Sequence, residues 1–509
     1  MVEQGIENPR VGGSIPSLGT THPKTFHDLR YSGTHGHWPL IFGALIYFVD
    51  KLQPASHFQR HNNAETIVIM THQISKRVLA SYSMVALPIG AMAMPIAIYM
   101  PPLYSGSLGL SLATVGLIFT LARIWDLITD PIMGVVIDRY GSRWGQYKHW
   151  VALAIPVLML AVYKVFLPNP SDVSAIYLGG WLLVLYIGYT MLSISHNSWG
   201  SVLAGDYDER SRIFGWREIF IISGMGLVLA IPAALDLVGD TSITEKVAAM
   251  GLFCLVLFPI TVLPTLLAVP DKQSVHTETI GLRDAADLVR ANPTLWRLLF
   301  ADFTTAFAMS STAALYIFFA TYAFELKDHA SMALLLYFFA GFLAMPAWLK
   351  LAYHMGKIGA IKIAVGYTML LQAGMFFVTD PGNIPLFWSY TFMAGLAFGA
   401  GPTLLHSMMA DLTEIDESKT GQKRAGMYFA LLATINKLGG ASAVGLTLTL
   451  ADKLFNFIPG SANSPEAING LLVIFCFAPA AALALTYLPL HRYPLNKESQ
   501  ADKKQQHSN

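Results

Sequence analysis

The chain has 509 residues, of which 54% are hydrophobic and only 13% are charged, and its formal net charge is +1. A soluble globular protein carries about 25% charged residues, so this composition excludes that class and indicates a polytopic membrane protein. The small net charge gives no basis for nucleic-acid binding. No Cys/His cluster has metal-ligand spacing, and Cys254 and Cys476 lie in apolar runs, where packing is expected rather than a disulfide.

The first 75 residues differ from the rest, because they are rich in Gly, Pro, His and Ser. Their one apolar run, residues 38–49, is too short to span a bilayer. It lacks a basic n-region and a small-residue cleavage site, so it is not predicted to be a signal peptide. We expect residues 1–75 to be a disordered extension, with Met70 as a candidate native start, and residues 491–509 to be a disordered polar tail.

Twelve apolar segments follow the extension, each close to the roughly 20 residues that a helix needs to cross a bilayer. They lie near residues 79–100, 112–137, 149–167, 175–198, 214–236, 248–268, 296–322, 330–352, 359–378, 384–409, 424–451 and 468–490. The longest polar gap, residues 271–295, is predicted to be a cytoplasmic central loop between residues 76–270 and 296–490. The prediction is an all-α membrane protein with two six-helix bundles and its site between them.

Lys and Arg set the predicted orientation, because they concentrate in cytoplasmic loops. With both termini cytoplasmic, the inner loops and flanks hold Arg139, Arg143, Lys148, Arg210, Arg212, Lys272, Arg283, Arg290, Arg297, Lys350, Lys357, Lys362, Lys419, Lys423 and Arg424. The outer side holds Lys164, Lys246, Lys327 and Lys453. This asymmetry supports twelve spans over eleven or thirteen, and it places a multi-pass protein in a cell membrane, with a bacterial inner membrane expected.

The second span carries two carboxylates, Asp126 and Asp130, inside an apolar segment. Residues four apart share one helical face, so both side chains point the same way. Each buried charge costs roughly 2.5–3.5 kcal/mol on insertion scales. Two on one face repel each other unless a cation lies between them or one is protonated. The spacing therefore predicts a cation or proton site inside the membrane.

Three sequence runs resemble one branch of the major facilitator superfamily, the glycoside–pentoside–hexuronide:cation symporters, which include melibiose permease. The first, DPIMGVVIDRYGSRWGQYKHW, covers residues 130–150; the second, WGSVLAGDYDERSRIFGWR, covers 199–217; the third covers 410–440 and contains ADLTEIDESKTGQKRAG. They occur in order across both halves, and the resemblance extends from about Ser75 to Leu490.

The resemblance implies roles for individual residues. Asp126 and Asp130 match the two acids of the family's cation site, and Thr129 stands where melibiose permease has an Asn beside them. Lys437 matches a lysine in the eleventh span that is linked to that site. Trp199 matches a tryptophan near the sugar, and Arg217 matches an arginine near the substrate.

The departures from melibiose permease concern the sugar grip. The first span contains no acid, and Ser195 stands at the position of the acid in the fourth span, followed by His196 and Asn197. His149 replaces a usual Pro. The residues of the coupling site are thus retained, while the acids that bind the galactoside are not. An acidic sugar held by Arg217 is therefore a leading candidate for the solute.

Several of these candidate residues could instead have a purely structural role. Asp126 can pair with Arg123 three residues earlier, and Asp302, in the seventh span, can pair with Arg297. Lys437 lies too deep to reach the interface by snorkelling. His196 is as consistent with a satisfied hydrogen-bonding residue as with a ligand or proton carrier. Four loop residues are predicted to gate the cytoplasmic face or only to set topology: Asp138, Arg139, Arg143 and Lys148.

The predicted function is secondary active symport of a small polar solute, a sugar, glycoside or uronic acid, coupled to Na⁺ or H⁺, with no other cofactor. In the Na⁺ case, Asp126 and Asp130 are the metal ligands. We expect a monomer in the lipid bilayer that binds no nucleic acid. A lipid-like or amphipathic solute is the alternative within transport. A membrane enzyme would have only His196 with Asp130 as a reactive pair, and a sensor would need a signalling domain that the sequence lacks.

Overall fold

Helices make up almost all of the described chain, as the long apolar runs predict. The computed structural model describes residues 74–203, 207–239, 241–271, 288–421, 424–491 and 493, and contains no strand among them. The predictions for the N-terminal extension, most of the central loop and the C-terminal tail fall on residues outside this set.

The predicted spans each coincide with a helix or part of one. The single-helix spans are α5 (Leu112–Arg139), α6 (Lys148–Phe166), α7 (Ala175–Leu203), α8 (Tyr207–Val238), α9 (Ile243–Ala268), α15 (Ala425–Lys453) and α16 (Pro465–His491). α11 (Pro293–Phe318) continues into a π-helical turn, η4 (Phe319–Ala323), and the short 3-10 helices η3 (Pro170–Asp172) and η5 (Lys327–His329) lie in connections.

The first span is longer and less regular than predicted. It runs through α2 (Lys76–Met84), α3 (Ala86–Met94), η1 (Pro95–Tyr99), α4 (Met100–Pro102) and η2 (Leu103–Ser107). Its prolines cannot donate the usual backbone hydrogen bond, and π-helical turns accommodate that loss within a continuous helix. The predicted end near residue 100 is therefore seven residues too early.

Ten helices of the described chain are individually long and apolar enough to cross a membrane, against twelve predicted spans. The difference has two causes. α12 (Ala330–Val378) joins the eighth and ninth spans across Gly356, whose φ of 81° breaks the helical geometry. The tenth span is divided into α13 (Ile384–Leu396) and α14 (Ala400–Thr420). A left-handed turn such as Gly356 needs a residue without a Cβ, so the chain can reverse there without a longer loop.

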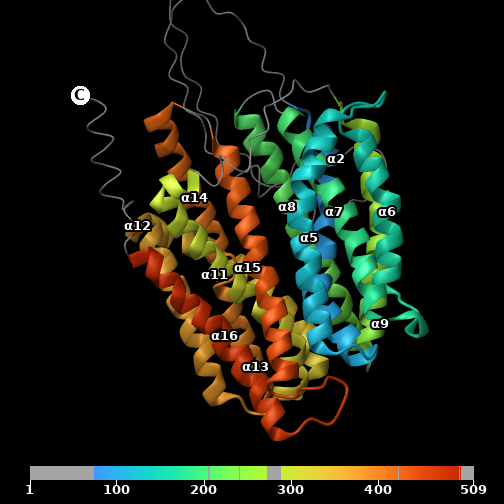
Figure 1. Cartoon of the computed structure of the whole chain (residues 1–509), viewed down its shortest axis with the longest axis vertical. Coiled ribbons are helices and arrows are strands. Elements are labelled where there is room, and N and C mark those ends of the chain that lie inside the picture. The colour runs from blue at the N-terminus through green and yellow to red at the C-terminus, as the bar shows by residue number, and fades with distance from the viewer. Residues whose placement is uncertain are drawn as a thin grey trace, which may run out of the picture. The chain divides into compact units, whose positions relative to one another are not determined.

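The helices form two bundles that lie side by side, α2–α9 in one and α11–α16 in the other (Figure 1). They approach most closely where α5 runs beside α15, with the Thr120 hydroxyl donating to the Ala441 carbonyl at 3.0 Å. A Cβ on Gly445 would lie 2.2 Å from Oγ1 of Thr120, so only glycine permits this approach. Towards the N-terminus of α5, the Ala113 amide donates to Asp452 of α15 at 3.0 Å.

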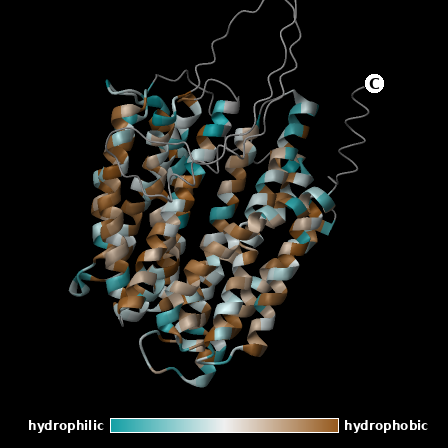
Figure 2. Cartoon of the chain, turned by 180° about the vertical axis from the view of Figure 1, so that it is seen from behind, coloured by the Kyte–Doolittle hydropathy of each residue, from teal (hydrophilic) through white to brown (hydrophobic). Residues whose placement is uncertain are grey.

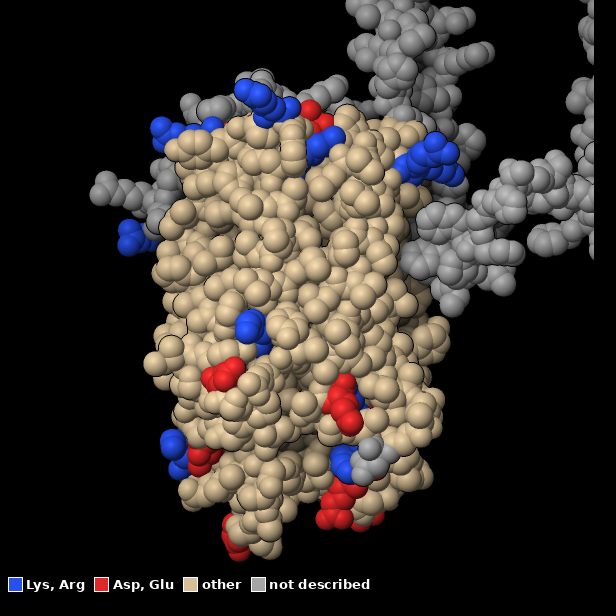
Figure 3. All heavy atoms as spheres, turned by 90° about the vertical axis from the view of Figure 1, so that its right-hand side faces the viewer, with Lys and Arg blue, Asp and Glu red and all other residues tan. Residues whose placement is uncertain are grey.

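The outer faces of the helices are apolar and suited to lipid. Large hydrophobic side chains project outward from both bundles, including Leu117, Leu263, Phe339 and Leu370, and hydrophobic residues cover the middle of the helices in Figure 2. Figure 3 shows Lys and Arg gathered at the upper end of one face, above a broad uncharged band. We call the end that carries Arg139 and Arg143 the basic end. Both cysteines are free and buried, as predicted.

Candidate cation and solute site

α5 and α15 meet at a charged cluster where the two bundles face each other. Asp126 is completely buried, and Asp130 lies one turn further along the same face of α5. Nζ of Lys437, on α15, lies 2.8 Å from Oδ2 of Asp126 and also contacts Oδ2 of Asp130. One ammonium therefore contacts two carboxylates on the opposite bundle, which links the charge state of the site to the packing of the two halves.

The hydroxyl of Thr190 completes the cluster from α7. Its Oγ1 lies 2.8 Å from Oδ1 of Asp126 and 2.9 Å from Oδ1 of Asp130. A hydroxyl carries one proton, so it can donate to only one of these oxygens at a time. A proton on the second carboxylate, or a cation between the oxygens, satisfies the remaining acceptor. Sequence reasoning missed Thr190, because a threonine in an apolar helix usually bonds to its own backbone.

Thr190→Val should lower the affinity for the coupling cation roughly tenfold, since it removes one hydrogen-bonding oxygen while keeping the shape of the side chain. Thr447→Val is the matched control, because Thr447 is equally buried and its hydroxyl bonds only to the Ala443 carbonyl of its own helix. Cation-dependent thermal stabilisation of the purified protein measures the change. Equal effects of the two substitutions would show that Thr190 is not a ligand.

Thr129 and Arg123 lie next to the acid pair and make other contacts. The Thr129 hydroxyl lies beside the site and donates to the backbone carbonyl of Asp126 at 3.2 Å rather than to a carboxylate. The Arg123 guanidinium lies 3.9 Å from Oδ2 of Asp126 and 4.9 Å from the centre of the Tyr186 ring. Asp126 therefore has both of its predicted partners: Arg123 within its own helix and Lys437 across the interface between the bundles.

The cluster offers oxygen atoms to a hard cation. Oδ1 of Asp126, Oδ1 of Asp130 and Oγ1 of Thr190 converge within hydrogen-bonding distance, and carboxylate and hydroxyl oxygens suit such ions. No group of three His, Cys, Asp or Glu side chains capable of holding a metal occurs within the part of the chain that the structure describes. Two carboxylates with a hydroxyl are consistent with either Na⁺ or a proton.

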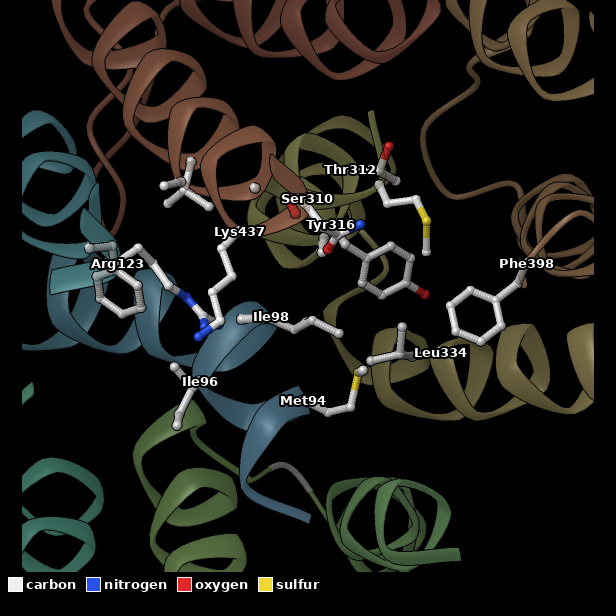
Figure 4. Close-up of a pocket in the computed structure, with 18 of the residues that line it drawn as sticks. Met94, Ile96, Ile98, Arg123, Ser310, Thr312, Tyr316, Leu334, Phe398 and Lys437 are labelled. Atoms are coloured by element: carbon white, nitrogen blue, oxygen red, sulfur yellow. The ribbon is translucent and has the colours of Figure 1, made fainter. Parts of the chain in front are cut away.

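A cavity of about 280 Å³ adjoins the cluster between the bundles. Arg123 and Lys437 project into one end of it, Met94, Leu334 and Phe398 line the other, and Ile98 lies between them (Figure 4). Asn436 and Ser310 add polar groups on the side of Lys437. The cavity is near the lower limit of small-molecule sites, which are about 300–1,000 Å³, so it suits a small solute held next to the charged cluster.

Comparisons with known proteins agree with this geometry. A profile of the family described as MFS/sugar transport protein matches residues 81–497, which is most of the chain.

The chain belongs to this family.

Proteins similar to this chain are named as symporters or transporters. The chain is 25% identical over 412 residues to a putative glycoside/cation symporter of Escherichia coli (strain K12), covering 77% of this chain and 86% of that protein. It is 24% identical over 433 residues to the isoprimeverose transporter of Lactiplantibacillus pentosus, covering 81% and 88%. A sodium-dependent lysophosphatidylcholine symporter of Xenopus tropicalis is 21% identical, with 75% of this chain and 80% of that protein covered.

Solved structures share the fold. The nucleoside transporter NupG superposes with a TM-score of 0.60 at 14% identity, covering 83% of this chain and 100% of the other. A bacterial homologue of the lysosomal transporter Spinster gives a TM-score of 0.58 at 14% identity, with 82% and 95% covered. The family match, together with this fold, shows that the protein is a multi-pass membrane transporter of the major facilitator type and not an enzyme.

The predicted substrate residues of α7 lie away from the cavity of this transporter. His196 is buried, with Nε2 2.8 Å from the Tyr82 carbonyl, and the Tyr82 hydroxyl donates to the His196 carbonyl at 2.7 Å. The Trp199 indole donates to the Pro270 carbonyl at 2.9 Å. Ser195 is buried and Asn197 half-buried, and neither lines the cavity. His196 and Trp199 thus tie α7 to α2 and to the end of α9.

Arg217 is also outside the cavity lining. Its guanidinium lies 3.8 Å from the Glu218 carboxylate, and its side chain is only 13% exposed. Asp302 is buried and accepts a hydrogen bond of 3.2 Å from Asn436, the residue before Lys437. The suggested Asp302–Arg297 pair is wrong, because Asp302 faces α15 rather than the end of its own helix.

The predicted gate residues lie at the basic end of the first bundle. Arg139 and Arg143 are exposed, and none of the ion pairs among the described residues joins either to the second bundle. Lys148 lies 6.0 Å from the centre of the Trp199 ring in its own bundle. Asp138 is exposed. Within the described ranges, Arg139, Arg143 and Lys148 thus contact only their own bundle or solvent.

Proposed function

We propose that the transporter couples the movement of Na⁺ or H⁺ to symport of a small polar solute: a sugar, a glycoside or a uronic acid. The observation that carries the proposal is the contact of one lysine, Lys437, with both Asp126 and Asp130 from the opposite bundle. The family match supports transport, and the named activities of the relatives support a glycoside and a cation as the transported pair.

The charges suggest a mechanism. Without a bound cation, Lys437 holds the acid pair and thereby holds α15 against α5. A cation that binds to Asp126, Asp130 and Thr190 takes over the neutralisation and frees the ammonium, which lines the solute cavity. A solute that engages Lys437 then completes the loaded state. Each ligand favours the same arrangement of the bundles, which is the thermodynamic basis of coupling.

The basic end is proposed to face the cytoplasm, with both termini on that side and the protein functioning as a monomer in a bacterial inner membrane. The bundles touch near the other end, where a Cβ on Gly460 would lie 2.7 Å from the Gly106 carbonyl oxygen. This contact at the opposite end favours a state that is open towards the cytoplasm. The coupling ion is the only additional component that the proposed cycle requires.

A thermal-shift screen tests the proposal. Sugars, glycosides and uronic acids, melibiose included, are added to the purified transporter with and without Na⁺ and at several pH values. A solute at one hundred times its Kd stabilises the folded state by about 2.7 kcal/mol, and coupling requires that the cation increase this shift. Absence of any cation effect on solute binding would contradict symport. Tight melibiose binding would contradict the expectation that neutral galactosides are poor solutes.

An amphipathic, lipid-like solute is the second candidate, and the apolar lining of the cavity favours it. A relative that is named as a lysophosphatidylcholine symporter gives a suitable probe. Cation-dependent stabilisation by lysophosphatidylcholine, with none by any glycoside in the screen, would select this candidate over a sugar.

A further inference from the structure

The two ends of the solute cavity differ in chemistry. Arg123, Asn436 and Lys437 supply charge and amide groups at one end, next to the cation cluster. The opposite end is apolar, and three aromatic rings of the second bundle, those of Tyr337, Phe338 and Phe398, contribute to its lining together with Met94 and Leu334 (Figure 4 labels Phe398). Their ring centres are 5.2 Å apart for Tyr337 and Phe338, 5.3 Å for Tyr337 and Phe398, and 4.9 Å for Phe338 and Phe398. We call these three residues the aromatic wall.

The aromatic wall is held in place by close packing of the helices behind it. Phe398 lies in the break between α13 and α14, and a Cβ on Gly341 of α12 would lie 2.9 Å from its Cβ. A Cβ on Gly395 would lie 2.3 Å from the backbone carbonyl oxygen of Tyr337. The rings are therefore a fixed surface, which can bind a rigid group with little loss of its own freedom.

Two hydroxyl groups near the aromatic wall, those of Tyr316 and Thr312, already have partners. The Tyr316 hydroxyl donates to the Ala330 carbonyl at 3.0 Å. The Thr312 hydroxyl donates to the Ala308 carbonyl at 3.1 Å and accepts from Gln372 at 2.8 Å. A sugar hydroxyl placed here would lose its hydrogen bonds to water and gain few from the protein, which costs free energy. The sugar is therefore expected to bind at the other end of the cavity.

A second, smaller cavity of about 70 Å³ lies behind the first, inside the second bundle. The two share Met309, Thr312, Tyr337 and Phe398 in their linings. The wall thus lies between the solute cavity and this second cavity.

We propose that the aromatic wall is a subsite for the apolar aglycone of a glycoside, whose sugar lies at the Arg123–Asn436–Lys437 end. The proposal rests on the proposed function. It assigns the recognition of the non-sugar part of the solute to the second bundle, and it makes glycosides with an aryl substituent better ligands than the free sugars.

Matched pairs of ligands test the subsite by titration calorimetry on the purified full chain. The probes are the 4-nitrophenyl β-glycosides of xylose, glucose, galactose and glucuronic acid, each compared with its free sugar, with Na⁺ present and absent. At least one nitrophenyl glycoside should bind roughly three- to tenfold more tightly than its free sugar, as expected for contact with aromatic rings. Failure of all four pairs to show this gain would overturn the proposal.

Phe338→Ala should abolish most of the gain and leave the affinity for the free sugar unchanged. Phe339→Ala is the control, since Phe339 is the next residue of α12 and its side chain is 60% exposed on the outer surface. Equal losses for glycoside and free sugar, or equal effects of the two substitutions, would overturn the proposal. Binding of lysophosphatidylcholine without any nitrophenyl glycoside would do the same.

Cysteine labelling gives a second measurement if Phe338→Ala does not fold. Leu334→Cys places a thiol in the cavity lining, while the native Cys254 and Cys476 are buried. The aryl glycoside should slow maleimide labelling at position 334 more than the free sugar does. Equal protection would count against the subsite. Cation-dependent thermal stabilisation that persists when the subsite tests fail would leave the proposed symport intact, and its loss would point to failure of the symport itself.

Discussion

Asp126→Asn and Asp130→Asn are each expected to abolish cation-driven accumulation of the solute. Lys437 and the coupling cation bind the same two carboxylates, and either substitution removes one of these charges. The cation then binds too weakly to displace the ammonium. Loss of one partner of a buried charged group costs about 3 kcal/mol, which corresponds to roughly a hundredfold in rate. Asp126 is completely buried, so Asp126→Asn should have the larger effect.

Uphill and downhill transport in proteoliposomes separate coupling from solute binding. Counterflow without a cation gradient should survive in part, because neither carboxylate is needed to hold the solute at the aromatic wall. Asp172→Asn is the control, as Asp172 is exposed in the η3 turn. Wild-type accumulation in both acid variants would show that the cluster is structural only.

Lys437→Ala is also expected to uncouple the transporter, but by strengthening cation binding instead of weakening it. Its removal leaves Asp126 and Asp130 one helical turn apart without an ammonium, and two such carboxylates repel each other unless a cation or proton binds. The empty state should become less stable by about 1–3 kcal/mol, and the affinity for a cation should rise because the competing charge is absent. Lys437→Arg, which keeps the charge, should restore part of the coupling.

Thermal unfolding across a pH range of roughly 5.5 to 8.5, with and without Na⁺, measures this change. The variant should depend on the cation more strongly than the wild type. Lys453→Ala is the control on the same helix, since the Lys453 side chain is 68% exposed. Unchanged cation dependence in Lys437→Ala would refute the proposed competition between the ammonium and the cation.

The sequence predicted where the spans lie better than it predicted where they end or break. Apolar length placed every span, because a helix that crosses lipid must satisfy its hydrogen bonds internally. It did not place the ends of α3–η2, where prolines are absorbed in π-helical turns. It also did not show the break of the tenth span before Ala400, since nothing in an apolar run with glycine specifies whether the helix continues or turns.

The functional residues divide in the same way. The spacing of Asp126 and Asp130 was sufficient to place both on one face, because the geometry of a single helix fixes it. Thr190 was not identifiable, since its partners lie 64 and 60 positions away and its sequence context matches that of other buried threonines. His196 shows the converse, because its polar ring is occupied by Tyr82, 114 positions away, although its sequence position suggested the solute.

The sequence by itself determined the class of the protein, the two sets of spans and the acid pair on one face of α5, because lipid exposure and helical periodicity act over short stretches of chain. Only the tertiary structure decided which other groups meet between helices. Thr190 reaches the acids, Asn436 holds Asp302, and the aromatic wall of α12 and Phe398 lines the cavity. These contacts depend on how helices cross, and side-chain packing between helices sets that crossing.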